Sequence, residues 1–374
     1  MMNKCFTFLI IFLNIYLIYS ASCPDYTFLP TEENVKIIGR YYINEEATWI
    51  VHSGSAIEFL ASGKYLELNL VGDNNIFQEE EYRPRYAVYF DDKLFIDTKI
   101  SSLQFNVQFK ISNDDTAKTK IKIMLLSENQ NGGVGIKNIK INSCSKDPDN
   151  IIVPTKKKKL SIEFIGDSIT NAYGVEALNQ SYHFTTTTEN FSKSYAYLAA
   201  KILNADYSSV SLSGHGIVSG YSTGEKWADG LMPLYYEKIS KNEYYPGDWD
   251  FENHKYDIVF INLGTNDANY VNADRDNRAD EFVEEFAKFL QTVREKNPDA
   301  YILCTLGTLN PKDMYVLVQK GIKLFGGDKI SSFESPVQDM ENDGLGADWH
   351  PSKITHIKLA ELVAQKISEI LDEE

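Results

Sequence analysis

Basic residues are scarce in this sequence relative to acidic ones. Its 374 residues include 37 Lys and Arg against 53 Asp and Glu, which gives a formal net charge of −16 at pH 7. Because affinity for nucleic acids comes largely from Lys and Arg side chains on phosphates, this balance argues against a polyanionic partner. It is compatible with a neutral or weakly basic substrate and with solubility outside a cell. We therefore expect no nucleic acid among its partners.

Long apolar runs are missing beyond the amino terminus. The run at the start, Phe6 to Tyr19, follows a lysine and precedes the small residues Ser20, Ala21 and Ser22. A membrane-spanning helix needs ~20 apolar residues, so this run is short for a span and has the layout of a secretory signal. We expect residues 1–22 to be a signal peptide and the mature protein to be secreted, with no membrane contact after cleavage. An uncleaved anchor is the alternative.

Cysteine is rare, with four residues in the whole chain, and Cys5 would leave with the signal. Cys304 lies inside "YILCTLGTL", a buried-strand pattern in which a free thiol behaves as a small hydrophobic residue. Cys23 and Cys144 stand at the two ends of the first half of the mature chain. A disulfide between these two would tie those ends together in an oxidising compartment, and we expect it to form.

Residues 23–150 contain no amphipathic helix of useful length and show a pattern of period two instead. Segments such as "YLELNLVG" (65–72) and "LQFNVQFKIS" (103–112) alternate apolar and polar residues, as half-buried antiparallel strands do. Turn residues such as Asn131-Gly132-Gly133 separate them. This pattern predicts a β-sandwich of jelly-roll type as a first domain.

The second half has a different pattern. The segment "DPDNIIVPTKKKK" (147–159) contains two prolines and a run of four lysines. We interpret residues 151–159 as a solvated linker rather than a nucleic-acid patch. From residue 160 to residue 374, strand patterns such as "YDIVFINLGTND" alternate with helical patterns such as "ADEFVEEFAKFLQTVREKN". This alternation predicts an α/β/α domain with a mainly parallel sheet.

Three strand ends in this second half carry residues suited to chemistry. Ser168 follows the first strand, Gly214 the second and Asn266, within "LGTND", the third. The carboxyl ends of parallel strands meet at one edge of the sheet, so these residues can converge. A fourth segment, "GADWHPS", precedes the last helix and holds His350. A serine, a peptide N–H beside glycine, a side-chain amide and a histidine are the components of an acyl-transfer site.

The roles follow from charge. Ser168 is the candidate nucleophile and His350 the candidate base. The N–H groups of Ser168 and Gly214 and the amide of Asn266 are candidate donors to an oxyanion. Each piece taken alone is also ordinary turn or loop chemistry, and their joint occurrence favours catalysis. With a histidine base of reference pKa ~6.5, we expect activity to fall around pH 6–7.

These four pieces, "IEFIGDSIT", Gly214, "GTND" and "DWHP", resemble the blocks of the SGNH, or GDSL, hydrolase superfamily. The β-rich half in front resembles carbohydrate esterase family two, whose members join a jelly roll to an SGNH domain. The resemblance implies a secreted O-acetylesterase, without metal or cofactor, acting on acetylated plant cell-wall polysaccharides such as xylan or glucomannan. Two alternatives stay open: a short-chain GDSL lipase or thioesterase, and a carbohydrate-binding protein with an inactive hydrolase domain.

One departure from the superfamily concerns the acid. The superfamily usually places it three residues before the histidine, where this chain has Ala347. Asp348, two residues before His350, can supply the carboxylate. Alternatively, the backbone carbonyl of Trp349 accepts the second ring N–H in a Ser-His dyad of the kind known in family two, and we favour the dyad. Some acceptor is required, because it fixes the tautomer and stabilises the imidazolium.

Several aromatic residues lie in or near the carboxyl-edge loops. Trp349, Tyr173 and Trp227 are candidates for a sugar platform, and Tyr221 and Trp249 are weaker ones. Core packing is the commoner use of such side chains. The sequence carries no indication of the oligomeric state.

Overall fold

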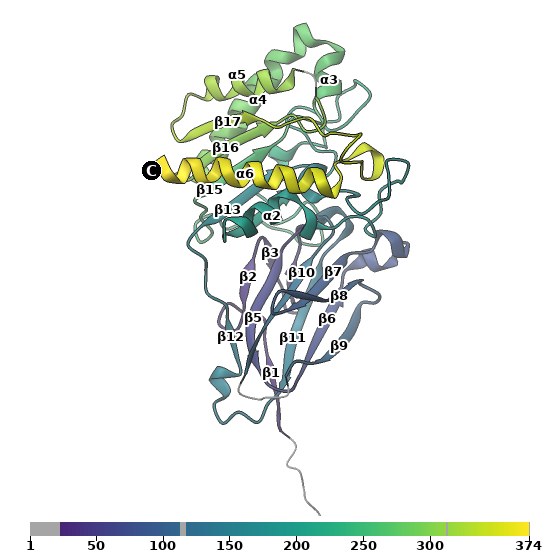
Figure 1. Cartoon of the computed structure of the whole chain (residues 1–374), viewed down its shortest axis with the longest axis vertical. Coiled ribbons are helices and arrows are strands. Elements are labelled where there is room, and N and C mark those ends of the chain that lie inside the picture. Colours follow the sequence, from purple (N-terminus) through teal and green to yellow (C-terminus); the bar gives the residue numbers. More distant parts are fainter. Residues whose placement is uncertain (1–22, 113–116, 312, 374) are drawn as a thin grey trace, which may run out of the picture.

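The computed structural model describes residues 23–112, 117–311 and 313–373. Within these ranges the chain forms a β-sandwich and an α/β part, stacked along the long axis of the molecule (Figure 1). The expected signal peptide, residues 1–22, lies outside the described residues. In the ranges that are described, no helix combines the length and the apolar character needed to cross a membrane.

The sandwich consists of two antiparallel sheets. The first has the strand order β3-β4-β11-β6-β9, with β1 paired to β11. Its strands are β1 (Asp25–Phe28), β3 (Tyr41–Ile43), β4 (Thr48–Ile50), β6 (Tyr65–Gly72), β9 (Gln104–Lys110) and β11 (Val134–Asn142). The second has the order β12-β5-β10-β7-β8, with β2 paired to β5. Its strands are β2 (Lys36–Ile38), β5 (Ala56–Ser62), β7 (Arg85–Phe90), β8 (Lys93–Lys99), β10 (Lys118–Leu125) and β12 (Ile152–Pro154).

Alternating side chains of both sheets fill the space between them. In β6, for example, Leu66, Leu68 and Leu70 are fully buried, and the residues between them are half-buried. The pattern of period two in the sequence therefore corresponds to one face of each strand turned to the core.

The segment expected as a linker, residues 151–159, begins inside the sandwich. Strand β12 pairs with β5, and Ile151 and Ile152 are buried in the sandwich core. The irregular connection to the α/β part therefore begins at Thr155.

The α/β part has a five-stranded sheet in the order β14-β13-β15-β16-β17, and every pair in it is parallel. Its strands are β13 (Ser161–Gly166), β14 (Asp206–Ser211), β15 (Ile258–Asn262), β16 (Tyr301–Leu306) and β17 (Ile330–Glu334). The helices are α1 (Ser168–Asn171), α2 (Tyr195–Ile202), α3 (Ala268–Ala273), α4 (Arg275–Lys296), α5 (Met314–Phe325) and α6 (Lys353–Glu373).

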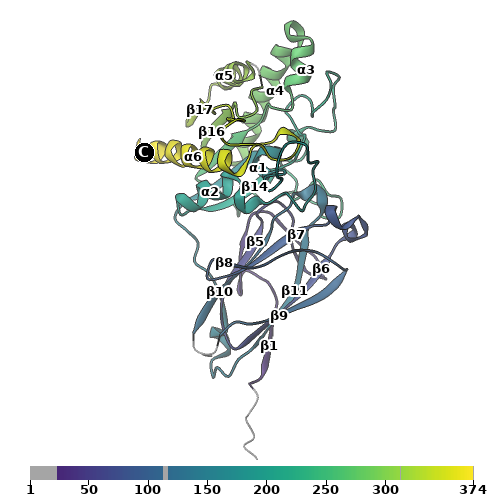
Figure 2. The same cartoon turned by 45° about the vertical axis from the view of Figure 1, so that its right-hand side comes forward.

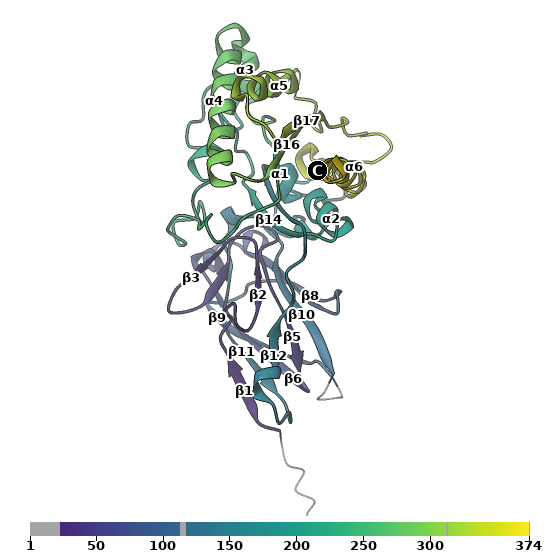
Figure 3. The same cartoon turned by 90° about the vertical axis from the view of Figure 1, so that its left-hand side faces the viewer.

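Helices cover both faces of this sheet. Helices α2 and α6 pack on one face, and α4 and α5 on the other, as the view in Figure 3 shows. Short 3-10 segments complete the fold; they are η1 (Asn74–Phe77), η2 (Glu80–Tyr82), η3 (Asn129–Asn131), η4 (Pro148–Asn150), η5 (Phe191–Lys193), η6 (Met232–Leu234) and η7 (Ala347–Trp349). The predicted fold class, a jelly-roll-like sandwich followed by an α/β/α domain, is confirmed.

The two parts share a core. Met124 and Leu126 from the sandwich are fully buried in the same apolar cluster as Phe164 of β13 and Tyr195 of α2. Figure 2 shows α1 and β14 at the end of the α/β part that faces the sandwich. Because buried apolar surface is removed from water on both sides of this junction, the sandwich and the α/β part stabilise one another.

A buried ion pair also crosses the junction. Arg40, between β2 and β3, is fully buried and places Nη2 3.1 Å from Oε1 of Glu163 in the middle of β13. Its Nη1 donates to the carbonyl oxygens of Tyr236 and Lys238. A charge is tolerated inside a protein only when it is paired and hydrogen-bonded, and Arg40 and Glu163 fulfil that condition for each other.

The cysteines occupy the places that the sequence suggested. Cys23 and Cys144 form a disulfide that joins the start of the sandwich to the segment after β11. Cys304 is a free, buried thiol in β16.

Candidate active site

Ser168 stands where β13 turns into α1. The carboxylate of Asp167 accepts the N–H of Ile169 at 3.0 Å and so caps the helix that Ser168 opens. A Cβ atom at Gly166 would lie 2.0 Å from Oγ1 of Thr170, so a larger residue does not fit this turn. The tight strand-to-helix turn presents the serine hydroxyl at the carboxyl edge of the sheet.

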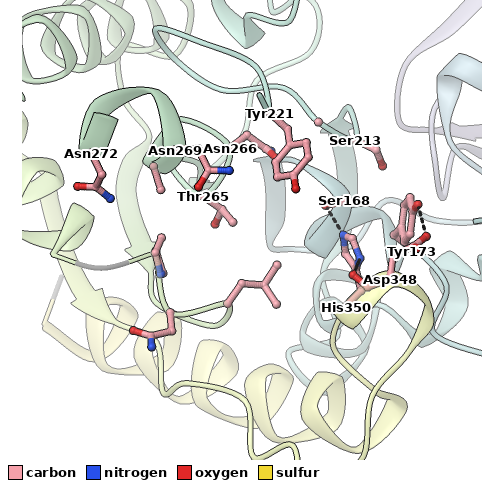
Figure 4. A pocket seen from close by; sticks show the side chains of 15 residues that line it. Ser168, Tyr173, Ser213, Tyr221, Thr265, Asn266, Asn269, Asn272, Asp348 and His350 are labelled. Atoms are coloured by element: carbon pink, nitrogen blue, oxygen red, sulfur yellow. Dashed lines mark hydrogen bonds between the residues drawn. The ribbon is translucent and has the colours of Figure 1, made fainter. Parts of the chain in front are cut away.

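His350 lies directly opposite Ser168 (Figure 4). Its Nε2 is 2.9 Å from Oγ of Ser168. Its Nδ1 is 3.2 Å from the carbonyl oxygens of both Ala347 and Asp348. Since carbonyl oxygens only accept hydrogen bonds, Nδ1 carries the proton and Nε2 is free to accept the serine proton. This is the tautomer that a general base needs.

The second ring nitrogen has backbone carbonyl acceptors, as in the favoured Ser-His dyad, but the residue expected to supply the carbonyl needs correction. The carboxylate of Asp348 does not reach His350, and the carbonyl of Trp349 accepts from Nε2 of Gln338 instead. The carbonyl groups of Ala347 and Asp348 take the Nδ1 proton. The cause is the backbone of η7, where Asp348 and Trp349 both have positive φ, 47° and 67°. Two left-handed residues in succession turn the Asp348 side chain away and its carbonyl inward.

The Asp348 carboxylate has a different set of partners. Its Oδ2 accepts the hydroxyl of Tyr173 at 2.9 Å and the N–H of Phe184 at 3.0 Å, and its Oδ1 is 2.8 Å from Nδ1 of His183. Partial burial raises the pKa of Asp348, but these donors outweigh it and hold the pKa below its usual range. The Tyr173 ring in turn stacks on the His350 ring with centroids 4.0 Å apart. Asp348 therefore fixes His350 from the side, through Tyr173.

The surroundings of His350 change its titration. Burial lowers its pKa to about 4, and the two carbonyl acceptors offset only part of this effect. The fall in activity expected around pH 6–7 is therefore placed too high. With a pKa of about 4, the imidazole is neutral, and so able to act as a base, at pH 5 and above.

The glycine loop after β14 brings Gly214 to the same edge. Strand ends are in register here, since Gly166 of β13 pairs with both Ser211 and Asn262. Gly214 has a φ of +79°, a conformation that favours glycine. No acceptor among the described residues takes its N–H, so this group is available to a ligand in the pocket.

Two aspartates, Asp167 and Asp267, organise this edge through hydrogen bonds to backbone N–H groups. Asp267 accepts the backbone N–H groups of Ile217, Val218 and Ser219 and so anchors the glycine loop. Burial raises the pKa of Asp167 to about 7 and that of Asp267 to about 6.

Asn266 lines the pocket but its amide is already engaged. Nδ2 donates to the carbonyl of His215 at 2.9 Å and to Oδ2 of Asp167 at 3.2 Å. His215 itself is not a second base for Ser168, because its Nδ1 donates to the Ser213 carbonyl and its Nε2 faces the ammonium of Lys241 at 2.9 Å.

These residues surround an open pocket of about 750 Å³. Besides the expected residues, amide and hydroxyl side chains line it that the sequence analysis missed: Ser213, Thr265, Asn269, Asn272 and Asn310. Asn266, Asn269 and Asn272 recur every third residue from the end of β15 into α3, a spacing that places them on one helical face. This spacing could have indicated from the sequence that Asn269 and Asn272 accompany Asn266 in the pocket.

The aromatic candidates occupy four different environments. Tyr173 and Tyr221 line the pocket. Trp349 is 58% exposed on the loop that carries His350, whereas Trp249 is buried against Tyr41 and belongs to the core. Trp227 lies under the glycine loop, since a Cβ at Gly214 would be 3.4 Å from its ring. The interpretation of Trp249 as part of a platform is therefore wrong, and Trp227 supports the loop.

No group of three or more His, Cys, Asp and Glu side chains suited to a metal ion occurs in the described ranges.

Part of the α/β half of the chain matches a known family of hydrolases. Residues 164–323 match the model of the GDSL-like lipase/acylhydrolase family. This part of the chain is similar to the GDSL-like lipases and acylhydrolases. The match begins in β13, four residues before Ser168, and ends in α5.

The relatives of this chain include carbohydrate esterases. It is 36% identical over 225 residues to the cellulase/esterase CelE of Acetivibrio thermocellus, a match that covers 58% of this chain and 26% of that relative. This chain thus spans about a quarter of that relative's length. It is 22% identical over 355 residues to an acetylxylan esterase / glucomannan deacetylase of Cellvibrio japonicus, covering 94% of this chain and 93% of the relative.

A solved structure resembles the whole arrangement. A family two carbohydrate esterase from Clostridium thermocellum, in complex with cellohexaose, superposes with a TM-score of 0.77 at 25% identity and covers 90% of this chain and 99% of that one. The resemblance includes the sandwich, so the pairing of a sandwich with a GDSL-like domain is shared with family two carbohydrate esterases.

Proposed function

We propose that this protein is a secreted carbohydrate O-acetylesterase that works through an acyl-enzyme on Ser168. The observation that carries the proposal is the 2.9 Å contact between the Ser168 hydroxyl and Nε2 of His350, at the rim of the polar pocket. The carbohydrate esterases among its relatives, and the GDSL-like family itself, support the reaction class.

In the first half-reaction, Oγ of Ser168 attacks the ester carbonyl carbon while Nε2 of His350 takes the hydroxyl proton. The tetrahedral intermediate collapses when the bond to the sugar oxygen breaks, and the imidazolium returns that proton to the sugar oxygen. The products are a free sugar hydroxyl and acetyl-Ser168. During this step the carbonyl groups of Ala347 and Asp348 hold Nδ1–H and stabilise the imidazolium.

In the second half-reaction, a water molecule takes the place of the sugar hydroxyl. Nε2 of His350 removes one of its protons, and the oxygen attacks the acetyl carbon. Collapse of the second intermediate breaks the bond to Oγ, which regains its proton from the imidazolium. Acetate leaves and the enzyme is restored.

The negative oxygen of both intermediates requires donors aimed at it. The N–H groups of Ser168 and Gly214 are two. We assign the third to Nδ2 of Asn266, which would exchange its 3.2 Å contact with Asp167 for the oxyanion. Such contacts commonly tighten only when the substrate is bound.

The proposed substrate is an acetylated plant cell-wall polysaccharide, such as xylan or glucomannan. The Cellvibrio relative is named as an acetylxylan esterase and glucomannan deacetylase. Amide and hydroxyl groups from Asn269, Asn272, Asn310 and Tyr221 around the pocket suit sugar hydroxyls. Secretion rests on the proposed signal peptide at residues 1–22.

Acetate release from acetylated xylan and from acetylated glucomannan, compared between wild type and Ser168→Ala, tests the proposal. We expect release by the wild type alone. A series of nitrophenyl esters separates the lipase and thioesterase alternatives, because a maximum at octanoate rather than acetate would contradict the acetyl assignment. Polysaccharide binding with no ester cleavage by either form would instead support a binding protein with an inactive hydrolase domain.

A further inference from the structure

A carboxylate from the sandwich reaches the edge of the proposed active site. Glu128 lies in the connection between β10 and β11 and is only 3% exposed. Its Oε2 accepts the backbone N–H of Ser213 at 2.9 Å and Nδ2 of Asn171 at 3.0 Å. Both partners belong to the α/β part, so Glu128 crosses the junction to bind them.

The two partners are the neighbours of two proposed oxyanion donors. Ser213 immediately precedes Gly214, whose N–H is a candidate donor. Asn171 ends the four-residue helix α1, which begins with Ser168. A single carboxylate oxygen thus links the peptide before one donor to the helix that carries the other.

The sandwich holds the Ser213 backbone from both sides. Glu128 accepts its N–H, and Nε2 of Gln130 donates to its carbonyl oxygen at 3.2 Å. Ser53, also from the sandwich, donates to Oδ1 of Asn171 at 2.9 Å. Glu128 thus holds the peptide group before Ser213, and Gln130 holds the one that joins Ser213 to Gly214.

We propose that Glu128 is a positioning residue, which sets the Gly214 N–H relative to Ser168 so that both point at the same oxyanion. This inference rests on the proposed acyl-transfer function of the site. Glu128 does not touch the substrate; it acts through Ser213 and Asn171. The sandwich therefore contributes to the geometry of the active site as well as to the stability of the chain.

The charge of Glu128 fits this role. Its Oε2 also accepts from Nε2 of Gln130, so one oxygen receives three donors. Glu189 accepts the backbone N–H of Glu128 at 2.9 Å, and its other carboxyl oxygen is buried without a partner. Burial raises the pKa of both groups, and for Glu189 the neighbouring Glu128 raises it further. Two buried carboxylates do not both ionise readily, so the proton belongs on Glu189 and the charge on Glu128.

Removal of the side chain tests the inference. In Glu128→Ala, the Ser213 N–H loses its acceptor, and the Gly214 peptide is held only through the Ser213 carbonyl, which still accepts from Gln130 and His215. We expect kcat for 4-nitrophenyl acetate to fall about 10- to 100-fold, less than the loss of a donor outright, with little change in KM. Glu128→Gln should recover most of the lost kcat, because its side-chain carbonyl still accepts the N–H of Ser213.

The matched control is a second polar link across the same junction. Lys36 of the sandwich is also buried, and its Nζ lies 2.7 Å from Oδ1 of Asp206. Asp206 is the first residue of β14, at the opposite end of that strand from the site. Lys36→Met should lower the unfolding temperature as Glu128→Ala does, but leave kcat unchanged. Equal losses of kcat in the two variants would contradict the positioning role and show that Glu128 only stabilises the junction.

An ester whose carbonyl oxygen is replaced by sulfur isolates the oxyanion. Sulfur accepts hydrogen bonds weakly, so displaced donors should slow 4-nitrophenyl acetate more than its thiono analogue. Glu128→Ala should therefore lower the rate on 4-nitrophenyl acetate relative to the rate on its thiono analogue, and Asn266→Ala should do the same. A proportional loss on both esters overturns the inference. If Glu128→Ala does not fold, Glu128→Asp, which keeps the charge but shortens the reach, should show the same drop in this relative rate.

Hydrogen exchange gives a readout that does not depend on turnover. The backbone N–H of Ser213 should exchange faster in Glu128→Ala than in the wild type and in Lys36→Met. Unchanged exchange at Ser213 would contradict the positioning role whatever the activity. A wild type that exchanges as expected but cleaves no ester would contradict the proposed function and leave the Glu128 contact established.

Discussion

The sandwich and the α/β part bury polar groups in different places. The sandwich core between its sheets is made of apolar side chains such as Leu68 and Ile139, and the buried polar groups Arg40 and Glu128 lie at the end that faces the α/β part. The α/β part instead buries polar groups along the carboxyl edge of its sheet, where Asp167, Asn266 and Asp267 surround Ser168. Burying polar groups costs free energy unless they are satisfied, so a concentration of them marks the region with a task other than folding. The comparison assigns the chemistry to one part, and stability and positioning to the other.

The largest expected effect lies in the α/β part. His350→Ala removes the proposed base, and the loss in kcat on 4-nitrophenyl acetate should be roughly 10⁶-fold, as for the histidine of a serine hydrolase. The circular dichroism spectrum should match the wild type, because the main packing of both parts is untouched. Residual activity within tenfold of the wild type would break the assignment of the chemistry to this residue.

The converse variant lies in the sandwich. Arg40→Met leaves Glu163 buried without a partner, and the free energy of unfolding in urea should fall by about 3–5 kcal/mol. The kcat of the folded fraction should stay at the wild-type value, since Arg40 contacts no residue of the pocket.

An exposed ion pair of the sandwich provides the control for Arg40→Met. Lys120 and Asp92 are paired near the surface, and Lys120→Met should cost ~0–1 kcal/mol. A lower kcat in folded Arg40→Met would show that this ion pair affects the active site as well as the stability of the chain.

The oxyanion hole gives the next effect. Asn266→Ala should lower kcat about 10²–10³-fold with KM nearly unchanged, because the amide stabilises charge that develops only in the transition state. Asn269→Ala, one helical turn further along the same pocket wall, should instead act mainly on KM for acetylated oligosaccharides. If the two variants have the same kinetic signature, Asn266 is a binding residue and the third donor must be sought elsewhere.

The pH dependence sharpens the comparison further. With a pKa of about 4, His350 remains neutral at pH 5, and kcat/KM should hold from pH 8 to pH 5 and fall toward pH 4. A histidine at the reference value of ~6.5 would be mostly protonated at pH 5 and the rate about thirtyfold lower. A midpoint near 6.5 would contradict the enclosed environment of His350.

Stability has to be followed in the same experiment. His52 of the sandwich is buried, which lowers its pKa to about 3. In the unfolded chain it protonates below pH ~6.5, whereas in the folded chain it stays neutral, so the free energy of unfolding decreases as the pH falls from there. Circular dichroism at each pH separates this loss from the titration of His350.

The smallest effect is expected at Asp348. Asp348→Asn keeps an oxygen that accepts the hydroxyl of Tyr173, so kcat should fall by less than about tenfold, against ~10⁴ for the acid of a full triad. Tyr173→Phe removes that hydrogen bond but keeps the ring stacked on His350, so its loss should also stay below about tenfold. A drop near that of a triad acid would show that the carboxylate reaches His350 during turnover.

The periodicity of the sequence predicts much of the fold. Alternation over residues 65–72 and 103–112 predicts strands β6 and β9, and helical spacing over 279–297 predicts most of α4. The approach of Ser168, Gly214, Asn266 and His350 to one another could also be foreseen, because parallel strands bring their carboxyl ends to one edge. That the sandwich continues through β12, beyond the expected boundary at residue 151, could not be foreseen, since β12 is too short to show a period.

The elements, their order and the residue types available for acyl transfer can be predicted from the sequence, because periodicity and strand ends are local properties. Which of these groups contact one another depends on the folded chain. Two left-handed residues turned Asp348 from His350 toward Tyr173, and the packing of the sandwich brought Glu128 to the peptide before Gly214. Contacts of this kind depend on backbone dihedral angles and on segments far apart in the chain, and neither leaves a periodic trace in the sequence.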